Sequence, residues 1–200
     1  MKYSTQIIKL SDLNEIVEIH MKAFRDFFLT NLGRSFLKTY YKSSILNDDF
    51  IGICAINENK EIAGFAIGTV LSKGYHKKLI RQNLFPFIKQ VIIIAFKNPF
   101  SIVRLYKNLN KTHTSIDDGN YCELLSIGVS GEYKGQGIGK LLIERFETEA
   151  SAKGCEKVTL TTDYYENDDV VNFYQKRGYM VFYDFFTYPE RKMYKLIKEI

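Results

Sequence analysis

The chain has 200 residues, of which 46% are hydrophobic and 26% charged, with three prolines and three cysteines. This composition is typical of a folded protein with a sizeable core, and it excludes a disordered, collagen-like or disulfide-scaffolded chain. The formal net charge of +5 comes from one segment, because nine lysines and arginines and no acidic residue lie between Glu61 and Asp117. No nucleic-acid-binding motif accompanies these charges, so we expect no nucleic-acid partner.

The first 70 residues predict a strand, two helices and two further strands. The strand covers residues 3–10, and Ser11 is placed to cap a helix with apolar positions between residues 13 and 28. Gly33 opens a second helical stretch, whose apolar positions run from Phe36 to Ile45. Strands are predicted over 50–56 and 61–70, joined by a polar link. The second of these is apolar on both faces, which indicates a central strand.

Residues 71–116 have a different character. Pro86 and Pro99 each suit the first turn of a helix, and Asn98 is placed to cap the second helix. Apolar residues nearly encircle the first helix, although the run over 91–96 is too short to cross a bilayer. We therefore predict an inserted pair of basic helices, followed by a polar loop over 112–120.

The last third alternates strands and helices. Strands are predicted over 121–129, 158–163, 179–186 and 191–197, and helices over 137–152 and 167–177, the second closed by Gly178. This alternation predicts a mixed α/β sheet with a parallel portion in a single domain covering residues 1–200.

The cysteines and histidines indicate no metal site. Cys54, Cys122 and Cys155 are widely spaced without a CxxC pair, which favours buried thiols in a reducing compartment. The N-terminus lacks the pattern of a secretory signal, so the cytoplasm is the expected location. The three histidines (His20, His76 and His113) are isolated, and His20 lies on the buried stripe of its helix.

One segment carries the pattern of an anion-binding turn. A strand ends at Val129, three glycines follow at alternate positions (Gly135, Gly137 and Gly139), and a helix starts at once. Converging backbone amides and a helix N-terminus would hold an anion, with Lys134 and Lys140 adding full charges. The spacing fits neither a P-loop nor a dinucleotide fingerprint. The alternative is a glycine-rich turn that holds no ligand.

This segment resembles the central motif of the GNAT family of acyl-CoA N-acyltransferases, which is Arg or Gln, two residues, Gly, any residue, and Gly or Ala. Here it reads Lys134-Gly-Gln-Gly-Ile-Gly139, so lysine departs from the motif but keeps its charge. A second match, Asn167-Asp-Asp-Val-Val-Asn-Phe-Tyr-Gln-Lys-Arg-Gly-Tyr179, resembles the family's later Asn…Phe-Tyr-x-Lys-x-Gly-Phe/Tyr segment. The resemblance is strong over 121–186 and weak over 1–70, and it leaves the insert unexplained.

The resemblance implies the fold and the coenzyme site. The fold would be the family's central twisted sheet, with the helical insertion between the third and fourth strands. Acetyl-CoA would be the co-substrate, with no metal. Its pyrophosphate would lie on the turn, and its pantetheine arm along the end of the preceding strand, where an amide could also stabilise the oxyanion. The residues implied are Ile127, Gly128, Val129, Lys134, Gly135, Gln136, Gly137, Ile138, Gly139, Lys140 and Asn167. The alternative for Asn167 is a plain helix N-cap.

Two residues are the catalytic candidates. Tyr174 stands where the family places the acid that protonates the departing thiolate, and the alternative is a core aromatic residue. Glu123, eleven residues before Lys134, stands where histone acetyltransferases of the family have a catalytic glutamate. Its alternative is a rim residue facing solvent, and the other candidates for the base are Asp117, Asp118 and Asp163.

The expected activity is acetyl transfer to a primary amine in a ternary complex. A small-molecule acceptor is favoured, with an amino sugar before a polyamine or antibiotic amine and before a protein amine. The alternative is a non-catalytic acyl-CoA-binding module. The insert could be a plain cover, an acceptor lid suited to an anionic amino sugar, or a membrane-surface patch bearing Phe85, Phe87, Phe96 and Phe100. Five aromatic residues could line the acceptor pocket (Phe24, Phe27, Phe28, Tyr183 and Tyr188), and a homodimer is also expected.

Overall fold

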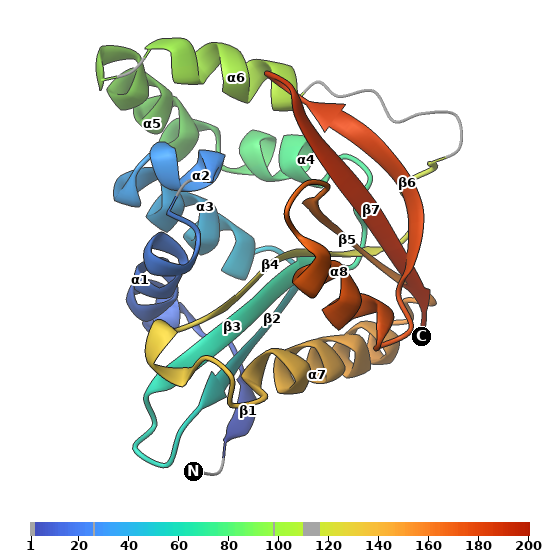
Figure 1. Cartoon of the computed structure of the whole chain (residues 1–200). Helices are drawn as coiled ribbons and strands as arrows, with labels where there is room; N and C mark the ends of the chain where they lie inside the picture. The colour runs from blue at the N-terminus through green and yellow to red at the C-terminus, as the bar shows by residue number, and fades with distance from the viewer. Residues whose placement is uncertain (1–2, 26, 98, 110–116) are drawn as a thin grey trace.

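The computed structural model describes residues 3–25, 27–97, 99–109 and 117–200. Its seven strands form one sheet in the order β1-β2-β3-β4-β5-β7-β6 (Figure 1). The strands are β1 (Ser4–Ile7), β2 (Phe50–Ile56), β3 (Ile62–Thr69), β4 (Cys122–Val129), β5 (Lys157–Asp163), β6 (Met180–Thr187) and β7 (Arg191–Glu199). Only β4 and β5 pair in parallel. The predicted mixed α/β sheet with a parallel portion is confirmed.

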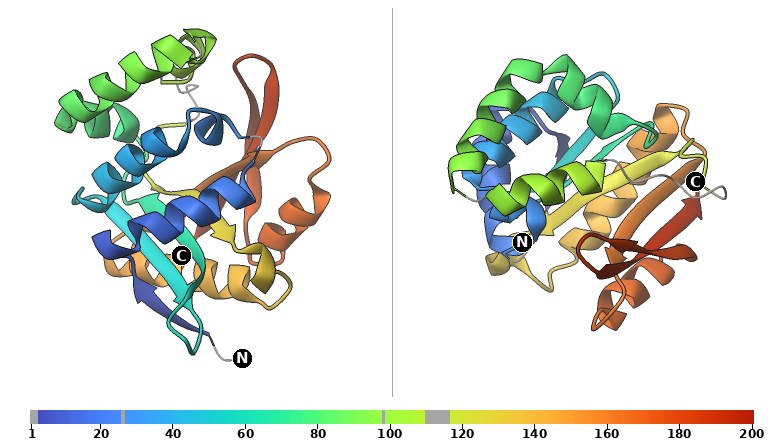
Figure 2. Two further views of the ribbon diagram at one scale, coloured as in Figure 1. Left: turned by 90° about the vertical axis from the view of Figure 1, so that its left-hand side faces the viewer. Right: turned by 90° about the horizontal axis from the view of Figure 1, so that it is seen from above.

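Helices cover both faces of this sheet (Figures 1 and 2). One face carries α1 (Leu13–Ala23), α2 (Phe28–Asn31) and α3 (Arg34–Ile45), and the other carries α7 (Ile138–Ala152) and α8 (Asp168–Gln175). Each layer buries its own core cluster against the sheet. The central β3 contributes to both, because all eight of its residues are buried, as its apolar pattern predicts.

The first predicted helix is shorter than its apolar spacing suggests. Ser11 is not its cap: a 3-10 turn covers Leu10–Asp12, and Asp12 occupies the N-cap position of α1. The helix ends before Phe24, whose carbonyl accepts a hydrogen bond from Thr30 Oγ1 (2.5 Å). Phe24 and Phe27 pack edge to face in the segment that connects α1 to α2. These aromatic residues therefore make apolar contacts, as their spacing suggests, but they lie outside α1.

The insertion after β3 contains three helices, not the predicted pair. They are α4 (Tyr75–Gln82), α5 (Leu84–Lys97) and α6 (Pro99–Leu109). Pro86 and Pro99 lie in first turns as predicted, whereas Asn98 and most of the 112–120 loop lie outside the described residues. The additional helix is α4, which buries Tyr75 and Leu79 against the core and ends where Asn83 Nδ2 donates to the carbonyl of Leu79 (3.0 Å).

Candidate active site

The strands β4 and β5 separate partway along their length. They pair only from Cys122 to Leu124, whereas β3 stays paired with β4 as far as Val129. The edge of β4 beyond Leu124 therefore faces a gap. Because Ser130 N donates to Ala63 O (2.9 Å), the alternation of an antiparallel ladder turns the amides of Ile127 and Val129 toward this gap. An extended polyamide arm could bind there as an added strand.

The glycine-rich turn follows directly after this edge. Gly135 and Gly137 both have φ near +78°, a left-handed conformation that favours glycine, and Gly137 is the N-cap residue of α7. No side chain caps the first amides of α7, which leaves them free for an anion. Gly139 lies beside Phe173 of α8, and a Cβ at this position would be in ordinary van der Waals contact with the Phe173 ring (3.4 Å). The turn has the form of an anion cradle.

Basic residues surround the turn. Lys134 is exposed, while Lys140 forms an ion pair with Glu144 (3.7 Å). Lys134 also borders a cleft of about 550 Å³ whose other charged lining residues are Lys22, Arg25 and Glu132. The sequence analysis missed Lys22 and Arg25, because Lys22 lies in the last turn of α1, Arg25 lies just after this helix, and only folding brings them to the glycine-rich turn.

We expect Gly137→Ala to weaken acetyl-CoA binding about tenfold or more, since a left-handed L-residue costs roughly 1–2 kcal/mol and the strained turn would re-orient its amides. Isothermal titration with coenzyme A measures this effect. Gly154→Ala is the matched control, because Gly154 has a similar φ of +81° and equally open surroundings at the other end of α7. Equal loss of affinity in both variants, or in neither, would contradict the role of the turn.

The two catalytic candidates lie on opposite faces of the sheet at the point of separation. Tyr174 belongs to the core cluster that includes Leu124 and Leu160, the last paired residues of β4 and β5. Glu123 lies on the other face, together with Ser72 and Lys195. A thioester reaching through the gap would thus have Tyr174 on its coenzyme side and Glu123 on the opposite side.

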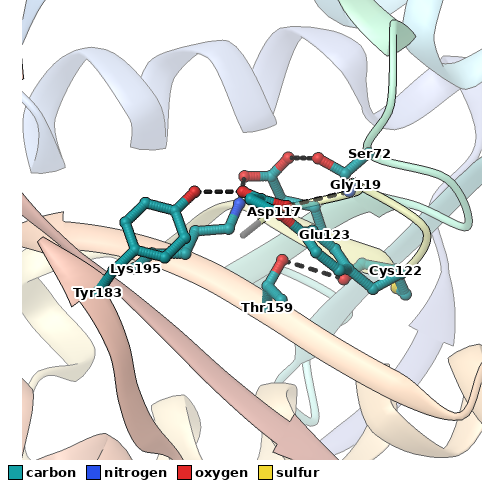
Figure 3. A network of polar contacts seen from close by, with 9 residues as sticks. Ser72, Asp117, Gly119, Cys122, Glu123, Thr159, Tyr183 and Lys195 are labelled. Atoms are coloured by element: carbon teal, nitrogen blue, oxygen red, sulfur yellow. Dashed lines mark hydrogen bonds and ion pairs between the residues drawn. The ribbon is translucent and has the colours of Figure 1, made fainter. Parts of the chain in front are cut away.

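Glu123 is the centre of a polar network (Figure 3). Its carboxylate accepts hydrogen bonds from Ser72 Oγ (2.5 Å) and from Lys195 Nζ (2.7 Å), whose side chain is only 5% exposed. Burial by itself would raise the pKa of Glu123, but the ammonium of Lys195 and these hydrogen bonds hold it below its usual value. Glu123 is therefore a paired interior carboxylate and not the solvent-facing rim residue of the alternative interpretation.

The other carboxylates proposed as bases are also engaged. Asp117 accepts hydrogen bonds from the hydroxyls of Tyr121 and Tyr183, and from Gly119 N (3.0 Å). Burial by itself would raise the pKa of Asp117, but these hydrogen bonds lower it, and the net shift is downward. Asp163 binds Arg191 through both carboxylate oxygens (2.5 Å each), and Asp118 is exposed and bonded to Asn120.

Tyr174 has an apolar environment. Its ring packs edge to face against Phe173 and Tyr179, and the side chain is buried. Burial raises the pKa of Tyr174 well above its usual value, so the hydroxyl keeps its proton at neutral pH. Tyr174 therefore packs as a core aromatic residue, and its protonated hydroxyl could still donate a proton.

Asn167 does not act as the simple cap proposed as its alternative role. It occupies the N-cap position of α8, but its side chain makes no capping bond. Instead Nδ2 donates to Thr162 Oγ1 (2.7 Å) and to the carbonyl of Asp163 (2.8 Å), which ties the end of β5 to α8.

Aromatic and cationic side chains meet where α6, the α1–α2 connection and the β6–β7 turn come together. Arg191 lies 4.4 Å over the ring of Phe27, Arg104 lies 4.7 Å over Phe28, and Lys107 lies 4.0 Å over Tyr188. Three of the five aromatic residues predicted to line the acceptor pocket are thereby brought together. Of the other two, Phe24 packs beside Gly128 and Tyr183 bonds to Asp117.

The charge balance of this cluster favours an anion. Arg191 is neutralised by Asp163, whereas Arg104 has no carboxylate partner among the described residues. Its Nε is buried and lacks a hydrogen-bond acceptor there. Burial and then the nearby charge of Arg191 lower the pKa of Arg104. An anionic group placed between the two guanidinium groups would accept a hydrogen bond from Arg104 and would offset the repulsion between Arg104 and Arg191.

The thiols and His20 stay outside this chemistry. Cys54 and Cys122 are buried free thiols as predicted, and Cys155 is half-buried. His20 is buried, bonds through Nδ1 to the hydroxyl of Tyr41 (2.6 Å), and burial lowers its pKa to about 4. Within the described ranges no group of three His, Cys, Asp or Glu side chains is placed to hold a metal ion.

The sequence comparison places the chain in a known class. The family model of the acetyltransferase (GNAT) family matches residues 13–179. The chain therefore belongs to the GNAT acetyltransferase family, and the resemblance inferred from its two motifs is confirmed.

Individual relatives are similar over a shorter length. The chain is 37% identical over 62 residues to "Acetyltransferase SG1711" of Sodalis glossinidius, which is 31% of this chain and 43% of that protein. It is 39% identical over 62 residues to "Uncharacterized protein YdhI" of Bacillus subtilis, covering 31% of this chain and 37% of the relative. The chain thus spans less than half the length of these curated relatives.

Solved structures share the fold. The ribosomal-protein-S18-alanine N-acetyltransferase of Escherichia coli superposes with a TM-score of 0.63 at 14% identity, covering 100% of this chain and 94% of that one. The PaiA N-acetyltransferase of Thermoplasma acidophilum, solved in complex with coenzyme A, gives 0.57 at 14% identity with both chains fully covered (100%). The expected fold class is confirmed.

Proposed function

We propose that this protein transfers an acetyl group from acetyl-CoA to a primary amine within a ternary complex. The separation of β4 and β5 beside the glycine-rich turn carries this proposal. The turn would hold the pyrophosphate through the amides of residues 135–140, with Lys134 nearby. The amides of Ile127 and Val129 would pair with the pantetheine arm, and the side-chain oxygen Oδ1 of Asn167, whose Nδ2 donates to Thr162 and Asp163, could accept a hydrogen bond from it. Acetyl-CoA is the co-substrate that family membership implies.

We assign a residue of this site to each step of the transfer. The neutral amine attacks the thioester carbon, and a β4 amide stabilises the oxyanion that forms. The C–S bond then breaks, and the departing thiolate takes the proton of Tyr174. The lowered pKa of Glu123 makes it a weak direct base, so we infer that it orders the water that takes the proton from the acceptor ammonium, or that it orients the ammonium while solvent water takes this proton.

The acceptor we favour is a small amine that also carries an anionic group, such as an amino sugar linked to a diphosphate. The guanidinium of Arg104, which lies near Arg191 and has no carboxylate partner within the described ranges, supports this choice. The aromatic faces of Phe27 and Phe28 next to these cations suit an apolar sugar face.

Replacing Arg104 with glutamine is expected to raise KM for an anionic amine about 10- to 100-fold, since a charge-assisted hydrogen bond contributes roughly 1.5–3 kcal/mol. KM for a neutral amine should stay the same. Steady-state rates with an amino-sugar phosphate and with the corresponding free amino sugar separate the two cases. Lys89→Gln removes an exposed charge from the same insert and serves as the control. An equal rise of KM for both amines would argue against anion recognition.

The proposal as a whole is tested by thiol release from acetyl-CoA across a panel of amines. Turnover on one class of amine would identify the acceptor. Coenzyme binding without turnover on any amine would favour the non-catalytic acyl-CoA-binding module, and absence of binding would overturn both. The single domain, the cytoplasmic location and the homodimer stay predictions.

A further inference from the structure

The inserted helices leave large apolar side chains in water. The three most exposed are Phe85 (84%), Phe96 (88%) and Phe100 (84%). Ile88 and Ile92 of α5 and Val103 of α6 are also exposed. These six residues are called the insert face below. Contiguous apolar surface of this kind on a folded protein usually marks a docking site.

The pattern follows the helix period, so it is a surface and not a set of isolated residues. Positions 85, 88, 92 and 96 share one side of α5, and the opposite side buries Phe87 and Ile94 against the core. The helices α5 and α6 pack against each other, which joins the two exposed arcs. The part of the insert face on α5 is therefore not the side of this helix that packs against the protein core.

The charge of the same segment indicates what covers this face. Exposed basic residues accompany it on α5 (Lys89) and on and before α4 (Lys73, Lys77 and Arg81), and the segment between Glu61 and Asp117 contains no acidic residue. Figure 2 (right) shows α4, α5 and α6 together at one end of the molecule. A second copy seated here would bring like charges together, whereas an anionic lipid surface complements them.

We propose that the insert face docks on an anionic phospholipid surface, with the phenylalanine rings at the boundary between headgroups and acyl chains. In Figure 1 the glycine-rich turn before α7 lies far from α5 and α6, so docking leaves the coenzyme side open. Arg104 and Lys107, on the same side of α6 as Phe100 and Val103, border the aromatic and cationic cluster through Phe28 and Tyr188. If the proposed function holds, docking would present that cluster to amines at the membrane surface.

The docking is peripheral. Within the part of the chain that the structure describes, no single helix is long and apolar enough to cross a membrane, whereas α4 and α5 meet the length and composition requirement together but are bent by 98°. Tyr75 and Leu79 of α4 are buried in the protein core and are not available to lipid.

Flotation of the full chain with vesicles tests the proposal without acetyl-CoA or any acceptor, so failure of catalysis cannot mimic failure of docking. We expect binding to phosphatidylcholine vesicles containing 30% phosphatidylglycerol, much weaker binding to pure phosphatidylcholine, and release by 0.5 M salt. Phe96→Ser/Phe100→Ser should lower the partition coefficient at least tenfold. Leu46→Ser/Met180→Ser is the control, because these side chains are also exposed (63% and 66%) but lie outside the insert.

Four results would overturn the proposal. The first is no binding to anionic vesicles, and the second is equal loss in the control variant. The third is a lipid-free dimer, measured by light scattering, that Phe96→Ser/Phe100→Ser converts to a monomer, since the insert face would then be a subunit interface. Retention on vesicles at high salt and alkaline pH would replace peripheral docking with membrane insertion.

Discussion

Replacing Tyr174 with phenylalanine is expected to lower kcat about 100-fold or more while KM for acetyl-CoA changes little, because a positioned general acid contributes roughly 10²–10⁴ to the rate. The substitution removes one hydroxyl and keeps the ring that packs against Phe173 and Tyr179. Initial rates at saturating substrates measure the effect. Since burial raises the pKa of Tyr174, wild-type activity should show no loss from its ionisation up to about pH 10, the usual pKa of tyrosine.

Tyr179→Phe is the matched control for this experiment. It removes a buried hydroxyl from the neighbouring ring, 5.5 Å away between centroids, without touching the proposed proton donor. If Tyr174→Phe keeps the kcat of the wild type, Tyr174 has only a packing role, and the thiolate takes its proton from water. Similar losses in both variants would indicate a packing effect.

Replacing Glu123 with glutamine should affect both stability and activity. The change leaves the ammonium of Lys195, 5% exposed, without its carboxylate, and an uncompensated buried charge costs about 3–5 kcal/mol in the free energy of unfolding. Chemical denaturation followed by circular dichroism measures this loss. Because the folded-state pKa of Glu123 is lowered, its contribution is present above about pH 4.3, the usual carboxyl value, and is lost as the pH falls. The free energy of unfolding of the variant should therefore fall less steeply than that of the wild type as the pH drops below about 4.3.

A second variant separates the structural and chemical roles of Glu123. Glu123→Gln/Lys195→Met removes both charges and should recover most of the unfolding free energy. If Glu123 orders a water or the acceptor, kcat should remain low in the double variant although the protein is stable. Recovery of kcat along with stability would show that the carboxylate only neutralises Lys195.

The insert connects the active site with the surface of the molecule. From α6 it supplies Arg104 and Lys107 to the aromatic cluster, and it exposes Phe85 and Phe96 on α5 and Phe100 on α6. The lid and membrane interpretations of the sequence thus concern different residues of the same helices, so they can be tested by different variants.

Local sequence was sufficient for the coenzyme side of the site. The apolar periods of residues 61–70 and 137–152 predict β3 and α7 because a strand or helix is determined largely by neighbours within a few residues. The glycines of the turn were recognised for the same reason: the left-handed backbone at Gly135 and Gly137 and the helix that follows form one continuous segment.

Only the tertiary structure revealed the groups that we propose for the acceptor side. Lys195 is 72 residues from Glu123 in the chain, and the sheet order that places β7 beside β5 brings them together. Arg104 and Arg191 likewise meet through packing, and Lys195 lowers the pKa of Glu123 only because both are withdrawn from water. Short-range patterns specify the elements and the anion-binding turn, whereas the strength and sign of an electrostatic interaction depend on distance and burial, which long-range packing sets.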